Sequence, residues 1–129
     1  MERKASYYAA IENLPPGLER AVLRIVTNGT RANPIPRGRI VTDCALMGFH
    51  TTERAVREAI RQLRRQGHLI GSTPGDHGGY YLMRTRDEYE EFIQTEFGAK
   101  IFDMLETKKA MDRSARDQFG EGHQLGLGL

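Results

Sequence analysis

The sequence predicts a mainly α-helical fold with one small β-hairpin, an α+β arrangement, followed by a long C-terminal helix. Apolar residues recur at helical spacing in three segments before residue 67. The glycine-dense stretch PGDHGG at 74–79 then separates two short apolar runs, which is typical of a hairpin. A capping-box pattern from Thr85 to Glu88 opens another segment with apolar residues at helical spacing.

The first helix is predicted at about 16–28. Pro15 and Pro16 precede it, and Asn28-Gly29 is a stop signal. Its apolar stripe follows i, i+3, i+4, i+7 and i+8 and consists of Leu18, Ala21, Val22, Ile25 and Val26. We interpret it as a core helix that follows an N-terminal arm, residues 1–15. Ile35 is expected to be extended because a residue before proline is pushed away from helical geometry.

The second helix is predicted at 37–47, and Gly48 ends it. The residues expected to point inward, wholly or in part, are Ile40, Val41, Cys44, Ala45 and Met47. Cys44 is the only cysteine, so the chain has no internal disulfide, and we expect a small core residue in a reducing compartment.

The third helix is predicted at about 52–66, capped by Thr52 or Thr51 and closed by Gly67. One side carries the apolar residues Ala55, Val56, Ala59, Ile60 and Leu63. The other side carries Arg54, Arg57, Arg61, Arg64 and Arg65, interrupted only by Glu58. A merely solvated face usually mixes charge signs, whereas arginine suits bidentate contact with phosphates and guanine edges. This face therefore predicts nucleic-acid contact, with a solvated face as the alternative.

Strand-like runs at 69–70 and 80–83 flank the turn. A lone hairpin is marginal in water, so alternate residues must pack on the helices. Two helices, a turn, a third helix and a hairpin follow one another in the order of a winged helix-turn-helix domain, which we assign to residues 16–84.

Residues 36–83 resemble the winged-helix domain of the biotin repressor and related bacterial regulators, known as helix-turn-helix type 11. The positions that match its recognition-helix and wing patterns are Val56, Ile60, Leu63, Gly67, His68 and Ile70, then Gly78, Gly79, Tyr80 and Leu82. The spacing from Gly48 to Val56 is two residues longer than the family pattern. No ligase or ligand-binding domain is recognisable in the sequence. The resemblance implies DNA binding, and stand-alone proteins of this layout are often similar to phage or prophage gene products.

The predicted DNA contacts form three groups. Base-reading or groove-wall candidates at the start of the third helix are Thr51, Thr52, Glu53, Arg54 and Arg57. Phosphate-contact candidates are Arg61, Arg64 and Arg65, with Arg37 and Arg39 at the start of the second helix. Wing candidates are Ser72, Thr73 and His77, with the backbone of Gly75, Gly78 and Gly79.

The C-terminal part differs from the rest in charge. Residues 31–86 carry a net charge of +6, residues 87–129 carry −5, and the whole chain carries +2. A helix is predicted over 85–112, with Gly98 marking a bend or break. Its apolar residues predict a homodimer through residues 87–111. Residues 113–129 have no lasting periodicity and are predicted to be disordered.

Other functions have weaker support in the sequence. The four histidines are scattered, and no metal-ligand spacing, nucleophile motif or phosphate loop is present. We therefore expect neither an enzyme nor a metal or cofactor. No apolar run is long enough to span a membrane, which favours a cytoplasmic protein. The rival hypothesis is a winged-helix docking or assembly module, for example in phage replication or packaging, and RNA is a further alternative to double-stranded DNA.

Overall fold

The computed structural model describes residues 9–120. They divide after Phe92 into a compact unit and a separate helical segment. The predicted fold class is confirmed, since the structure is mainly helical with one antiparallel hairpin and a long C-terminal helix. The division lies eight residues beyond residue 84, where the sequence placed the end of the domain.

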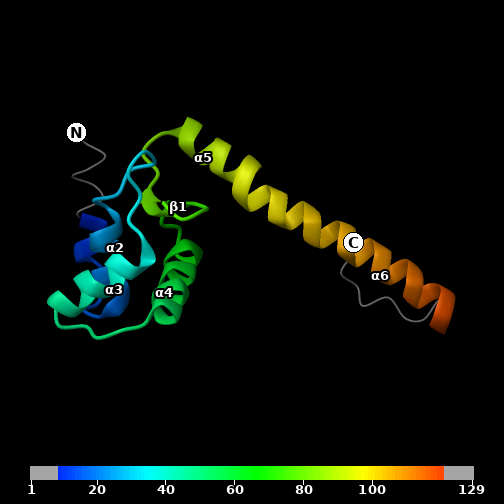
Figure 1. Ribbon diagram of the computed structural model, residues 1–129, viewed down its shortest axis with the longest axis horizontal. Helices are drawn as coiled ribbons and strands as arrows, with labels where there is room; N and C mark the ends of the chain where they lie inside the picture. Colours follow the sequence, from blue (N-terminus) through cyan, green and yellow to red (C-terminus); the bar gives the residue numbers. More distant parts are fainter. Residues whose placement is uncertain (1–8, 121–129) are drawn as a thin grey trace. The chain divides into compact units, whose positions relative to one another are not determined.

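Three helices build the core of the compact unit: α2 (Leu18–Val26), α3 (Arg37–Leu46) and α4 (Glu53–Arg65). Each packs on the other two (Figure 1). Their bounds agree with the predicted ranges to within two residues. The largest fully buried side chains include Leu23, Ile40, Ile60, Leu63 and Ile70. Residues 9–12 are also helical, and Ile11 is buried in this core, so part of the predicted N-terminal arm belongs to the compact unit.

Glycines end α3 and α4 in the same way. Gly48 and Gly67 have φ angles of 91° and 98°, the left-handed conformation that glycine adopts without steric cost. After α4, the amide of His68 donates to the carbonyl of Leu63, and that of Gly67 donates to Arg64, both at 3.0 Å. This Schellman arrangement satisfies carbonyls that a helix end leaves unpaired. The predicted roles of both glycines are confirmed, whereas Met47, expected to point inward wholly or in part, is 39% exposed.

The hairpin pairs β1 (Ile70–Thr73) with β2 (Gly79–Leu82), in a register that sets Ile70 opposite Leu82. Ile35 adds a third extended piece, as the following proline predicted. Its amide donates to the carbonyl of Tyr80 at 2.7 Å, and the amide of Tyr80 donates to the carbonyl of Ile35 at 2.9 Å. These two bonds join the hairpin to the chain segment that leads into α3.

Helix α5 (Arg86–Phe92) completes the compact unit. Thr85 caps it by accepting the amide of Glu88 at 3.1 Å, as predicted. The carboxylate of Glu88 accepts from the amide of Arg84 at 2.7 Å, one residue before the amide expected in a capping box. On the exposed side of α5, Glu91 forms a bidentate ion pair with Arg31. That pairing lowers the pKa of Glu91. Phe92, at the end of α5, is buried.

The C-terminal segment consists of a π-helix, η1 (Ile93–Phe97), and a helix of 22 residues, α6 (Gly98–Phe119). Gly98 lies at the change of helix type, where an added Cβ would lie 2.3 Å from the carbonyl oxygen of Ile93. The predicted irregularity at Gly98 is therefore present. The helix continues seven residues past the predicted end at 112, so the prediction of disorder is wrong for 113–119. Residues 121–129 lie outside the described part of the chain.

Candidate nucleic-acid interface

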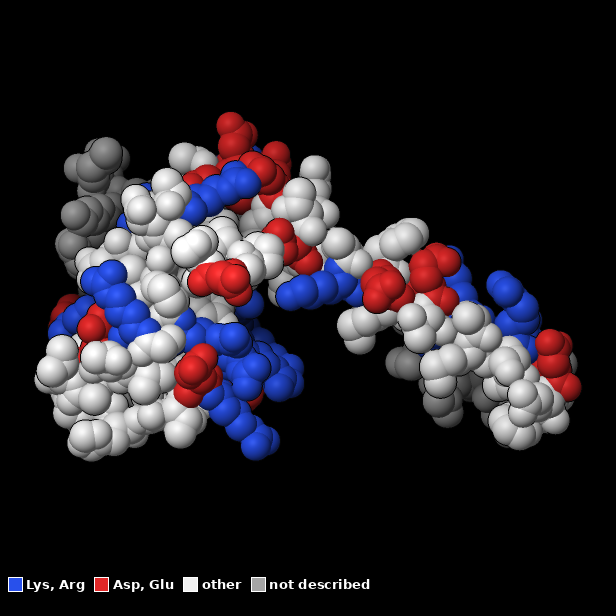
Figure 2. Space-filling view, in the orientation of Figure 1, with Lys and Arg blue, Asp and Glu red and all other residues white. Residues whose placement is uncertain are grey.

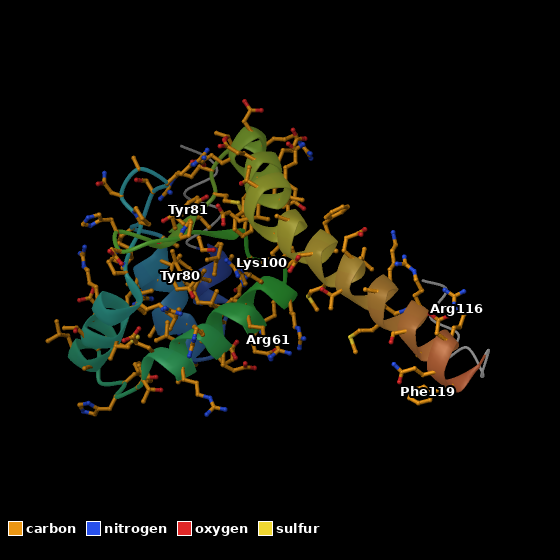
Figure 3. The ribbon with its side chains drawn as sticks, turned by 45° about the vertical axis from the view of Figure 1, so that its right-hand side comes forward. Arg61, Tyr80, Tyr81, Lys100, Arg116 and Phe119 are labelled. Atoms are coloured by element: carbon orange, nitrogen blue, oxygen red, sulfur yellow. The ribbon has the colours of Figure 1, made fainter. Side chains whose placement is uncertain are left out.

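The side of α4 that faces away from the core presents four exposed arginines: Arg54, Arg57, Arg61 and Arg65. We call these four side chains the arginine face. They lie within an arc of about 80° and extend about 16 Å along the helix axis. Figure 2 shows basic side chains gathered over α4, and Figure 3 shows Arg61 pointing away from α2 and α3. Burial of Val56, Ile60 and Leu63 fixes the rotation of the helix that exposes this face.

The arginine face is only slightly neutralised. Glu58 lies 3.5 Å from Arg61 and also accepts from Gln62 at 3.1 Å. Within residues 9–120, Arg54, Arg57 and Arg65 form no ion pair. Three unpaired guanidinium groups on one short helix repel one another, and an anion placed between them would relieve that repulsion.

Arg64 does not belong to the arginine face, although the sequence placed it among the phosphate contacts. Its guanidinium donates to the carbonyl of Ile70 at 2.9 Å and to the hydroxyl of Ser72 at 3.4 Å. It also lies 5.9 Å from the ring centre of Tyr80 and 5.4 Å from that of Phe92, within cation–π range. Desolvation lowers the pKa of Arg64. We therefore revise its role: Arg64 joins α4 to the hairpin and to α5.

Arg64→Ala should destabilise the fold by about 2 kcal/mol, because it removes charged hydrogen bonds to β1 and leaves the carbonyl of Ile70 unpaired. Arg65→Ala, at the neighbouring exposed position, should change stability by no more than about 0.5 kcal/mol. Urea unfolding of both variants measures the difference. Equal stability of the two variants would contradict the structural role of Arg64.

Apart from Arg54 and Arg57, the candidate residues around the start of α3 and the start of α4 have partners inside the protein. Thr52 caps the helix by accepting the amide of Ala55 at 3.1 Å. The Nε atom of Arg37 lies 3.6 Å from a carboxylate oxygen of Glu53, so these two candidates lie together and partly neutralise each other. Arg39 forms a similar 3.6 Å pair with Asp43. The exception is the Thr51 hydroxyl, which is buried and has no hydrogen-bond partner among the residues that the structure describes.

The hairpin contributes little positive charge. Residues 66–83 contain no lysine or arginine, and Asp76 lies at the exposed tip beside His77. Of the predicted wing contacts, Thr73 accepts the amide of Gly79 at 3.2 Å, and Ser72 accepts from Arg64. His77 is exposed at the tip. The hairpin can therefore offer backbone and polar groups to a neighbouring strand, while the cations come from α4.

Tyr80 and Tyr81 occupy opposite faces of the hairpin (Figure 3). Tyr81 is 2% exposed, and its ring occupies the space beside Gly71, where an added Cβ would lie 2.5 Å from the ring. Tyr80 lies beside Arg64. Both rings therefore pack against other parts of the protein, and neither forms an exposed platform for stacking bases.

Within residues 9–120, the remaining chemical groups do not form a second candidate site. Cys44 is buried, and desolvation raises the pKa of its thiol, which disfavours the nucleophilic thiolate. Among the described residues, no three His, Cys, Asp or Glu side chains are grouped so as to hold a metal ion. None of the helices within residues 9–120 has the length and apolar character needed to cross a membrane. A hollow of about 320 Å³ lies beside Pro16, Met47 and Phe49.

We compared the chain with models of protein families, with characterised proteins and with solved structures, and none of the three comparisons gave a match.

Proposed function

We propose that this protein binds double-stranded DNA, with α4 in the major groove and the hairpin beside the adjoining backbone. The observation that carries the proposal is the arginine face, four exposed guanidinium groups of which three have no ion pair in the described chain. An α-helix fits the width of the major groove, and arginine is the side chain best suited to guanine edges and phosphates. In this proposal the compact unit is a winged helix-turn-helix domain of the biotin-repressor-like kind, and the protein is a bacterial or phage transcriptional regulator.

The proposed contacts divide along the helix. Arg54 and Arg57 lie in its first half, which approaches the bases when a recognition helix enters the groove. Arg61 and Arg65 lie farther along and contact phosphates at the groove edge. Arg37 and Arg39 remain candidates for a further phosphate, provided that they exchange their weak ion pairs for it. Arg64 is excluded from the DNA contacts because its guanidinium donates to the carbonyl of Ile70 in the hairpin.

Salt dependence of binding tests the proposal. The affinity for random duplex DNA should fall as salt rises, and Arg65→Ala should reduce the slope of log K against log salt by about 0.9, the value for one lost phosphate contact. Arg64→Ala, measured where it remains folded, should leave that slope unchanged. Single-stranded DNA and RNA of the same length should bind more weakly than the duplex.

Absence of duplex binding even at low salt would overturn the proposal. It would favour the rival, a protein-docking module, for which the arginine face would contact an acidic protein surface. The hollow beside Pro16, Met47 and Phe49 offers apolar contacts to a partner of that kind.

A further inference from the structure

Helix α6 carries an apolar stripe with the spacing of a coiled coil. Ile101, Met104 and Met111 are 49%, 72% and 67% exposed. Together with Phe97 before them and Ala115 after them, they follow the alternating four- and three-residue spacing of heptad positions a and d, with Lys108 at the one polar position. We call positions 97, 101, 104, 108, 111 and 115 the α6 stripe.

Ion pairs along the helix add little to its stability. Lys108 pairs with Asp112 at 2.7 Å, and Lys109 pairs with Glu106 at 3.5 Å. Pairs of this kind between exposed side chains contribute little to stability. Most helices in proteins depend on packing of an apolar face, and that is the contribution the α6 stripe can supply.

The charges of this segment are distributed unevenly along it. Residues 93–107 carry three acidic side chains and one basic one, a net charge of −2. Residues 108–119 carry four basic side chains and two acidic ones, a net charge of +2. Two copies in parallel would place like-charged halves together, whereas two antiparallel copies place each acidic half against a basic half.

From this charge distribution and the heptad spacing, we infer that a second copy of the chain covers the α6 stripe as an antiparallel helix. A pairing centred near residue 106 places Ile101 against the partner subunit's Met111 and Met104 against the partner subunit's Lys108. It also places the large Phe97 against the small Ala115 of the partner subunit. Every one of these pairs matches an a position with a d position, and large residues face small or flexible ones.

The polar position strengthens the case for the antiparallel direction. In a parallel pair, the same heptad position meets itself, so the two Lys108 ammonium groups would lie side by side in the interface. In the antiparallel pair, each Lys108 lies beside a methionine and its ammonium can keep its bond to Asp112 at the interface edge. The opposite charges of residues 93–107 and 108–119 complement each other only when a second copy of the same segment packs antiparallel; a partner of different sequence would not require them.

The oligomeric state of the full-length protein tests the inference. Light scattering should give twice the chain mass of 14.6 kDa. Ile101→Asp, which places an unpaired charge in the interface, should weaken the dimer by at least about 100-fold. The matched control is Phe102→Asp, because Phe102 is 65% exposed but lies about 100° around the helix from Ile101, away from the stripe. A monomeric wild-type protein, or equal weakening by both variants, would overturn the inference.

Cysteine cross-linking tests the direction of pairing, with wild type as the background because Cys44 is buried. Mixing chains that carry Ile101→Cys with chains that carry Met111→Cys should give a mixed disulfide under mild oxidation. Ile101→Cys alone should not cross-link to itself, because its counterpart would lie ten residues away along the helix, about 15 Å. Efficient self-cross-linking at position 101 would mean a parallel pair and would overturn the antiparallel arrangement.

Discussion

Replacing both Arg54 and Arg57 with alanine should reduce the affinity for a DNA duplex that the wild-type protein selects from a random pool by roughly 30-fold or more. Each bidentate arginine–guanine contact contributes about 1–3 kcal/mol of discrimination. The two guanidinium groups have no competing ion pair in the described chain. The variant should keep its fold, since both side chains are exposed on the far side of α4 from the core. Fluorescence anisotropy with a duplex enriched from a random pool measures the loss.

A charge-matched control is available for this experiment. Arg86→Ala with Arg113→Ala removes the same number of positive charges from α5 and α6, where Arg86 is already paired with Glu90. The control should bind DNA almost as wild type does. Equal losses in the two double variants would mean that overall charge, and not the arginine face, determines binding.

The largest effect on stability is expected at Gly79. A Cβ atom there would lie 2.3 Å from the carbonyl oxygen of Ile35 and 2.7 Å from the nitrogen of Pro36, both of them backbone atoms. Gly79→Ala must push β2 away from residue 35 and weaken the two hydrogen bonds between Ile35 and Tyr80. Overpacking and the lost bonds together should cost about 3 kcal/mol.

Thermal unfolding of Gly79→Ala and Gly38→Ala checks this prediction. Gly38 lies in α3, and an added Cβ there would meet no atom within 4 Å, so alanine should be neutral or stabilise the helix by up to about 1 kcal/mol. An unchanged melting temperature for Gly79→Ala would show that residue 35 and the hairpin separate freely. The close backbone approach would then no longer explain why glycine occupies position 79.

Helix positions were the most predictable part of this fold. The apolar spacing of α2 and α4 identifies the buried side directly, and a glycine with positive φ ends both α3 and α4. The prediction failed at 113–119, where apolar periodicity ends although the helix does not. That segment reads RSARDQF and contains no glycine or proline before Gly120. Because glycine and proline are the residues that most disfavour a helix, their absence from 113–119 indicates that the helix can continue there.

The role of Arg64 could not be predicted from α4 alone. On a helical projection it lies at the border between the basic and apolar arcs, so its environment depends on what packs there. The rings beside it belong to Tyr80 and Phe92, 16 and 28 residues later in the chain. Only the folded hairpin and α5 bring them to the guanidinium. The structural role of Arg84 could not be predicted for the same reason. Its guanidinium donates to the carbonyls of Thr27 and Gly29, which lie far away in the sequence.

The most direct test of DNA binding by the arginine face is an NMR titration of the labelled full-length protein with a random duplex at low salt. Signals from Arg54, Arg57, Arg61 and Arg65, and from the hairpin tip at 74–78, should shift together and in proportion to bound DNA. Signals from the hollow beside Pro16 and Phe49 should stay in place. Shifts confined to that hollow, or no shifts at all, would contradict DNA binding through α4.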